Sequence, residues 1–265
     1  MAWAGVWVVL GGGVLEAHGD LREQIAAVSA RLQVDPRNAN LYLKRAELYR
    51  GLGEWDLALA DYDRSAAANP RLTVVDLARG KTLVEAGRAE QARPSLDRFL
   101  ARQPDHWEGL IARARMWVKL GRLPFAIEDY NRGIARAAAA RAEYFLERAR
   151  AQAGDGRVEE ALRGLDEGVR RLGPLVTLEV YGIELELKQK RYDAALARLD
   201  RITGQADRKD SWLARRGEIL EQAGRREEAR RSYRAALAAI DSLPAARRNV
   251  PATTELERRL KGELR

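Results

Sequence analysis

The 265-residue sequence contains no cysteine, and its two histidines, His18 and His106, lie far apart. Without cysteine there can be no disulfide framework, no thiolate metal site and no cysteine nucleophile. The histidines do not form a cluster with ligand spacing, so a zinc site is not expected. We therefore expect no bound metal ion and no cofactor.

Catalytic motifs are missing as well. The sequence has no Ser/His/Asp arrangement and no phosphate-binding loop, and its glycine run 11–13 lies in an apolar N-terminal segment. The paired acids 159–160 and 227–228 suit the first turn of a helix, where they favour the positive end of the helix dipole. The inventory argues against an enzyme.

Residues that favour strands are scarce. Aromatic residues make up 6% of the chain and there are only eight prolines, whereas alanine, leucine, arginine and glutamate dominate. These abundant residues have high helix propensity, so we expect an all-α protein.

The chain is basic, with a formal net charge of +8 and a pI near 9.9. Such a charge is typical of proteins that bind nucleic acid, anionic membranes or acidic peptides. However, 40 of the 47 basic residues are arginine, which is also the coding bias of a GC-rich genome, and 39 acids are interleaved with them. Both interpretations of the charge stay open.

The N-terminus differs in composition, because residues 2–15 carry no charge. The stretch is too short for a membrane span of about 20 apolar residues, and it suits the core of a secretory signal that ends at small residues near Gly19. The basic start of a signal is missing, so a retained anchor and a buried helix are alternatives. We predict a signal peptide at 1–19 and a periplasmic or secreted protein, otherwise a cytoplasmic one. Membrane attachment is expected only through an uncleaved segment.

A 34-residue period runs through the rest of the chain. Its clearest marker is a small residue near the start of the second helix of each repeat, at Ala58, Ala92, Ala126, Ala161, Ala195 and Ala229. A turn residue recurs in phase, as Gly53, Gly87, Gly121, Gly156, Lys190 and Gly224. Each turn residue is expected in the left-handed conformation that ends a helix.

The first repeat resembles a tetratricopeptide repeat at nearly every signature position, through the stretches 41–49 and 53–62 and the final Asn69-Pro70. The resemblance implies a right-handed α-solenoid of antiparallel helix pairs with about six units. They are predicted at 39–72, 73–106, 107–140, 142–175, 176–209 and 210–243. A half-repeat helix is predicted at 20–38 and a C-terminal capping helix at 244–265.

Some residues depart from the pattern. One residue is inserted before repeat four, which ends at Gly173-Pro174, and repeat five lacks both the small first-helix residue and the turn glycine. We expect the stacking angle to change there. At the end of the chain, residues 254–257 are interpreted as a capping box that starts the last helix.

By the same resemblance, ligands are expected in a concave groove lined by the first helices of the pairs. One row of groove positions is apolar and suits either a peptide trough or packing between helices: Leu43, Leu77, Ile111, Leu146, Val180 and Ala214. The next row has a basic middle and acidic flanks: Glu47, Lys81, Arg115, Arg150, Glu184 and Glu218, with Lys119 one turn beyond Arg115. The recurring tyrosines and Trp117 are expected to pack between helices.

We therefore predict a non-enzymatic scaffold, monomeric, that binds a protein or peptide partner. The sharper hypothesis is that Lys81, Arg115, Lys119 and Arg150 receive acidic side chains or a terminal carboxylate. The alternative for this row is a solvated face with pairs inside each helix. The alternative function is nucleic-acid binding by a basic solenoid, although the apolar row does not resemble a base-reading code. Self-assembly through the solenoid ends is a third possibility.

Overall fold

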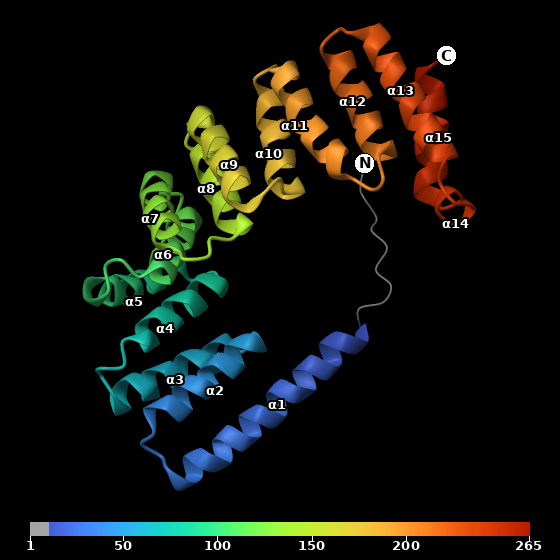
Figure 1. The fold of residues 1–265 in the computed structure, drawn as a ribbon. Coiled ribbons are helices and arrows are strands. Elements are labelled where there is room, and N and C mark those ends of the chain that lie inside the picture. The colour runs from blue at the N-terminus through green and yellow to red at the C-terminus, as the bar shows by residue number, and fades with distance from the viewer. Residues whose placement is uncertain (1–10) are drawn as a thin grey trace. The chain divides into compact units, whose positions relative to one another are not determined.

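The computed structural model describes the backbone of residues 11–265 and the side chains of residues 19–265, and this part of the chain is helical without strands. Its contacts divide the chain into two compact units, one that ends at Ala138 and one that spans Ala139–Arg265. Each unit consists of consecutive antiparallel helix pairs (Figure 1). The all-α fold is thus confirmed.

The first unit begins with a single long helix, α1 (Gly11–Val34), which packs against α2. Three pairs follow: α2 (Ala39–Gly51) with α3 (Trp55–Ala68), α4 (Val74–Glu85) with α5 (Ala89–Arg102), and α6 (Trp107–Lys119) with α7 (Leu123–Arg136). The start of α2 is fixed by Asn38, whose side chain accepts hydrogen bonds from the backbone N–H groups of Asn40 and Leu41. His106 is the corresponding cap of α6, so its imidazole has a structural role.

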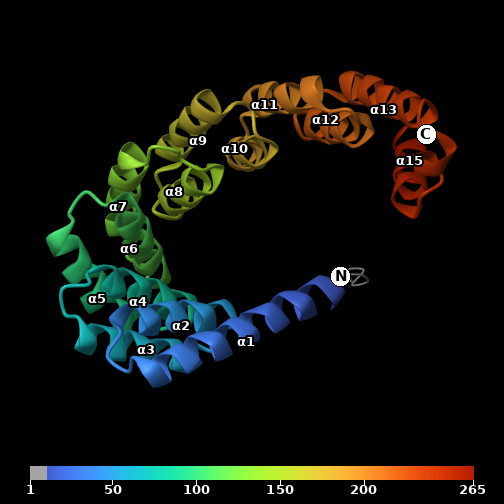
Figure 2. The same cartoon turned by 60° about the horizontal axis from the view of Figure 1, so that its bottom comes forward.

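The second unit contains three more pairs and a C-terminal cap. The pairs are α8 (Ala142–Gly154) with α9 (Val158–Leu172), α10 (Val176–Lys188) with α11 (Tyr192–Gln205), and α12 (Asp210–Gln222) with α13 (Arg226–Asp241). The short α14 (Ala245–Arg248) then leads to α15 (Pro251–Glu263), which packs beside α13 (Figure 2).

The turn inside every pair has the predicted left-handed residue. Its φ lies between 67° and 80° at the five turn glycines, and Lys190 takes the same place in repeat five with a φ of 56°. A side chain other than glycine is strained in this conformation. The 34-residue period therefore predicts the turns correctly. In repeat five, where glycine is absent, the backbone of Lys190 is strained.

The small and large signature residues pack against each other inside the pairs. The six recurring alanines of the second helices are completely buried, and Tyr62, Tyr130 and Tyr233 are almost completely buried. At Gly217 an added Cβ would lie 2.1 Å from Cε1 of Tyr233, so only glycine allows this approach. The predicted packing role of these tyrosines is confirmed.

The start of the last helix was predicted wrongly. The helix α15 begins at Pro251, and Thr254 lies inside its first turns, where its hydroxyl donates to the carbonyl of Pro251 at 3.0 Å. Proline at the first helical position has no N–H to satisfy and already has a helical φ, so it starts the helix before the apparent capping box can do so. The predicted end near Leu264 agrees with the structure.

At the N-terminus, the uncharged residues 2–10 lie outside the described residues. The helix α1 continues without a break through Gly19 and Asp20, the predicted border of the signal peptide. Among the described helices, none is long and apolar enough to span a bilayer. The signal peptide and the cellular location stay predictions.

The division between the units coincides with the inserted residue. The second helix α7 ends at Arg136, and the next pair starts after the short segment from Ala137 to Arg141. The step between the marker alanines is one residue longer here than elsewhere. The division therefore falls at the first of the two irregularities that the sequence shows, and the expected change of stacking angle stays a prediction.

Candidate functional site

The acidic end of the predicted groove row, Glu47 on α2, is tied to neighbouring helices. Its carboxylate accepts from the Tyr62 hydroxyl at 2.7 Å and from Arg50 at 2.7 Å. The other side of the Arg50 guanidinium binds Glu85 on α4 at 2.9 Å. Burial by itself would lower the pKa of Arg50, but the two carboxylates raise it above its ordinary value. Glu47 thus belongs to a polar link between α2 and α4.

The basic residues of the first unit lie on the next two first helices. Lys81 on α4 is half-buried, and its Nζ lies 3.6 Å from the carboxylate of Glu108 on α6. Arg115 is half-buried on α6, and Lys119 is exposed in the last turn of that helix. A cation at a helix C-terminus is favoured by the helix dipole. Lys81, Arg115 and Lys119 are thus a row of basic side chains on α4 and α6, with Glu108 paired to Lys81.

The apolar row of the first unit is mostly closed. Leu77 and Ile111 are 5% and 3% exposed, and Leu43 packs against the cluster around Ala46 and Tyr62. An added Cβ at Gly133 of α7 would meet the Cδ1 atom of Ile111 at 2.9 Å, which shows how closely this side chain is held. These positions therefore offer little apolar surface to a partner.

The remaining predicted residues belong to the second unit. Leu146 on α8 is half-buried, whereas Arg150 on α8 and Glu184 on α10 are exposed. The guanidinium of Arg150 lies over the ring of Tyr181, 5.7 Å from its centroid, in a cation–π contact between α8 and α10. Arg150 is thus held near α10, and both Arg150 and Glu184 act electrostatically on the Tyr181 hydroxyl.

Sequence reasoning missed a second periodic feature, an arginine that precedes the small first-helix residue. It recurs as Arg45, Arg79, Arg113, Arg148 and Arg216, with Gly182 in repeat five. The guanidinium of Arg113 shows the pattern: it forms two parallel hydrogen bonds to Asp129 of its own repeat, at 2.7 and 2.9 Å, and a third at 3.0 Å to Asp97 of the preceding repeat. The 34-residue recurrence of the arginine was the available signal.

Contacts of the same kind recur within each unit. Arg45 binds Asp61 of its own repeat at 2.6 and 2.9 Å. Arg79 reaches back to Asp63 of the preceding repeat, and Arg216 reaches back to Asp200. The Asp61 carboxylate is buried, whereas Asp63 and Asp200 are exposed, so the pair of Arg45 is the one whose geometry is fixed most firmly by the rigid guanidinium. These arginines therefore form ion pairs within the protein.

Surface notches open beside this arginine in repeats three, four and six. Their volumes are about 220, 470 and 270 Å³. The notches of repeats four and six lie between the first and the second helix of one pair, whereas that of repeat three is also lined by Arg93 and Asp97 of α5. The largest is the notch of repeat four, between α8 and α9. Among the described residues no group of histidine and acidic side chains could hold a metal ion.

The repeated pairs, their left-handed turns and their polar surface define a helical-repeat protein. Two family profiles match the chain, a tetratricopeptide repeat profile over residues 77–142 and a tetratricopeptide repeat-like domain profile over residues 165–251. The chain belongs to the tetratricopeptide repeat family. Proteins with this fold are typically scaffolds for protein–protein interaction, which is the functional class that the fold supports.

Solved structures have the same fold at low sequence identity. A tetratricopeptide repeat protein from Parabacteroides merdae aligns with a TM-score of 0.58 and 18% identity over 92% of this chain and 93% of its own. PilW, a type IV pilus biogenesis factor, aligns with a TM-score of 0.62 and 20% identity over 75% of this chain and 93% of its own. MamA from Desulfovibrio magneticus RS-1 gives 0.53 and 12% identity over 57% of this chain and 85% of its own.

A curated relative is the mouse protein DnaJ homolog subfamily C member 3. It is 27% identical over 102 residues, which is 38% of this chain and 20% of the relative. The chain thus spans about a fifth of the length of this relative.

Proposed function

We propose that this protein is a non-enzymatic scaffold that binds an acidic polypeptide segment along the first helices of its N-terminal unit. The observation that carries the proposal is the row of basic side chains formed by Lys81, Arg115 and Lys119 on α4 and α6, of which Lys119 is exposed. Because Leu77 and Ile111 are buried beneath this row, a partner meets charged side chains there. Carboxylates of an extended segment would pair with them.

Lys81 and Lys119 offer the most direct test. We would purify the partner from cells that produce the protein, map its acidic segment, and measure the affinity of that segment as a synthetic peptide by fluorescence anisotropy. Replacing both lysines by glutamate should weaken binding by about tenfold, since each exposed charge pair contributes about 0.5–1 kcal/mol.

A matched control keeps the total charge change equal. Arg37 and Arg71 are exposed in turns outside the row, so the double Arg37→Glu, Arg71→Glu variant carries the same change in net charge. It should bind within about twofold of the unaltered protein. Equal loss in the two double variants would show that only the overall charge matters, and an unchanged affinity of the lysine variant would refute the proposed surface.

A further inference from the structure

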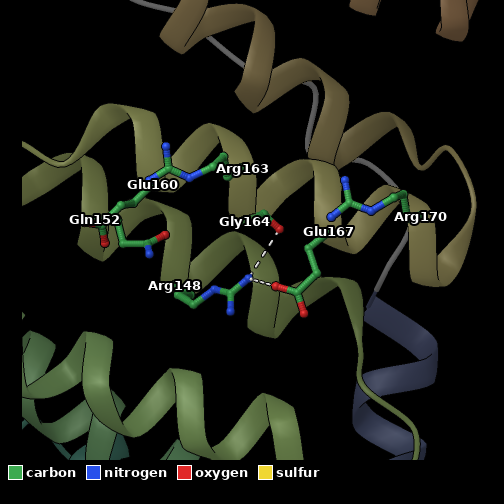
Figure 3. A pocket seen from close by; sticks show the side chains of 7 residues that line it. All are labelled: Arg148, Gln152, Glu160, Arg163, Gly164, Glu167 and Arg170. Atoms are coloured by element: carbon green, nitrogen blue, oxygen red, sulfur yellow. Dashed lines mark hydrogen bonds and ion pairs between the residues drawn. The ribbon is translucent and has the colours of Figure 1, made fainter.

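One core position of the first helices is polar in repeats four and five. It lies three residues after the small first-helix residue, and in the other repeats it is apolar or aromatic: Tyr49, Leu83, Trp117 and Leu220. Leu83 and Leu220 are 2% and 1% exposed, so this position faces the core of a pair. Repeat four has Gln152 there, among the residues that line its notch (Figure 3), and repeat five has Glu186.

Glu186 on α10 therefore brings a carboxyl group into the core of the C-terminal unit. The residue is 6% exposed, and its Oε2 atom accepts no hydrogen bond within the described part of the chain. Nη1 of Arg191 lies 3.9 Å from Oε2, and Nε of Arg198 lies 3.8 Å from Oε1, both beyond hydrogen-bond distance. A buried carboxyl group without a hydrogen bond is costly in its ionised form.

The charged groups around Glu186 come from α9, from α11 and from the turn before α11. Two arginines and two acids act on it electrostatically: Arg198, Arg191, Glu159 and Asp166. Arg191 binds Glu159 of α9. Arg198 binds Asp166 of α9 and Glu179 of α10. A further neighbour of α10 is α8, whose Arg150 lies over the ring of Tyr181. The positive charge near Glu186 is thus shared with other carboxylates.

These surroundings favour the neutral acid. Burial is the largest effect and raises the pKa of Glu186, and the two arginines offset only part of the rise. Because the folded pKa lies above the ordinary value of 4.5, ionisation of Glu186 costs stability. This cost is absent below about pH 4.5 and grows as the pH rises through the folded pKa. The protonated side chain is uncharged, like the leucines at this position in repeats two and six.

We propose that Glu186 makes the packing of α10 against α11 sensitive to pH, so that repeat five opens less readily in mildly acidic solution than in neutral solution. The ionised carboxylate regains full hydration only when the two helices separate, so ionisation favours local opening. The turn that joins these helices also has the strained backbone of Lys190. The device lies in the C-terminal unit and needs no partner, so it goes beyond the proposed function.

Hydrogen exchange of the full chain, followed by mass spectrometry, tests the proposal helix by helix. Protection factors remove the intrinsic pH dependence of exchange, and they are compared between about pH 4.5 and about pH 8. Those of peptides from α10 and α11 should fall by about threefold or more as the pH rises. Peptides from α4 and α5, where Leu83 has the same register, are the internal reference and should change less.

Two neutral variants and one matched control assign the effect to the buried carboxyl group. Glu186→Gln keeps the size of the side chain and should abolish the fall in protection. Glu186→Leu places there the residue of repeats two and six, and it keeps the test informative if glutamine packs poorly. Glu184→Gln removes the same charge from an exposed position of α10, so the fall should persist in this control.

The proposal would be overturned if the fall in protection were equal in Glu186→Gln and the unaltered protein, or if it disappeared in the Glu184→Gln control. Lower protection of α10 and α11 in both neutral variants at about pH 8 would also overturn it, because the carboxylate would then stabilise the pair through its arginines. Charge reversal at Lys81 and Lys119 should leave the fall unchanged, so failure here is distinguishable from failure of the proposed function.

Discussion

In repeat five, where the recurring first-helix arginine is absent, the guanidinium of Arg198 takes its place. Repeat five has Gly182 at that position, and an added Cβ there would lie 2.8 Å from Nε of Arg198. Arg198 comes from the second helix α11, is 4% exposed, and binds Asp166 at 2.9 Å and Glu179 at 3.2 Å. The guanidinium thus occupies the usual place while coming from the opposite helix of the pair.

Removing this guanidinium should be strongly destabilising. Glu179 is completely buried and Glu186 nearly so, and burial already raises the pKa of Glu186. Arg198→Met leaves these carboxylates with less positive charge, so we expect the free energy of unfolding to fall by about 3–5 kcal/mol. Urea unfolding followed by circular dichroism measures the loss. Arg258→Met, at an exposed ion pair with Glu255, should leave the free energy of unfolding almost unchanged; equal costs would contradict the interpretation.

Glu167, which lines the notch of repeat four, should make the free energy of unfolding depend on pH. Burial by itself would raise the pKa of Glu167, but Arg148 and Arg171 hold it below its ordinary value of 4.5. Since the folded pKa is the lower one, ionised Glu167 stabilises the fold above about pH 4.5, and this contribution is lost as the pH falls through the folded pKa.

Glu167→Gln should therefore be less stable than the unaltered protein at pH 7, by less than about 1 kcal/mol because the side chain is partly exposed. The difference should shrink as the pH falls below about 4.5. Urea unfolding at several pH values tests this. A difference that stayed constant with pH would show that Glu167 acts only through packing.

Among the elements, the turn of repeat five carries an avoidable strain. Lys190 has a φ of 56°, whereas the other five turns have glycine in this conformation. Lys190→Gly should raise the free energy of unfolding by about 1 kcal/mol, because glycine adopts positive φ without a steric cost. The reverse change in another repeat, Gly224→Lys, should lower it by a similar amount. Thermal unfolding of both variants is the measurement, and shifts in the same direction would contradict the argument.

The helix pairs could be predicted from the sequence because each turn and each close contact depends on one residue type. Gly217 predicts close packing by itself, since nothing larger fits beside Tyr233. The start of α15 was missed because Pro251 and Thr254 offer competing start signals, and the capping box at Thr254 was given more weight than the proline at the first helical position. The role of Arg198 in place of the missing arginine could not be predicted from the sequence either, since it depends on which side chains of two helices face each other.

Less of the candidate site than of the fold could be predicted from the sequence. The register placed Lys81 and Lys119 on first helices, and the structure shows Lys81 beside Glu108, which lies 27 residues away. Periodicity gives the face of a helix, but the partners of a charged side chain depend on rotamers and on neighbouring repeats. The notch of repeat four was missed because its shape depends on how the side chains of α8 and α9 are arranged.

At the scale of the whole molecule, the C-terminal unit depends on its cap. Leu260 of α15 is 1% exposed, and with Leu256 it packs on the cluster that contains Tyr233 and Ile240 of α13. Terminal repeats of a solenoid need a polar outer face to stay soluble. Deleting residues 244–265 should therefore lower the thermal midpoint and cause self-association, measured by light scattering.

Leu260→Ala is the companion to this truncation. It should cost about 2–4 kcal/mol through the cavity it leaves, while α15 still covers α13. The point variant should therefore remain monodisperse under native conditions. A truncated chain that stayed equally monodisperse and stable would show that α15 is dispensable.

The arginine that reaches back to the preceding repeat also determines which repeats can be exchanged. Repeat two carries Arg79 on its first helix and Asp97 on its second. In a tandem duplication of residues 73–106, Arg79 of the second copy would therefore lie beside Asp97 of the first copy, and Asp97 of the second copy would still bind Arg113. Repeat five carries Gly182 instead and depends on Asp166 of repeat four for its Arg198. Duplication during evolution, or grafting in the laboratory, should therefore tolerate repeat two at more places in the array than repeat five.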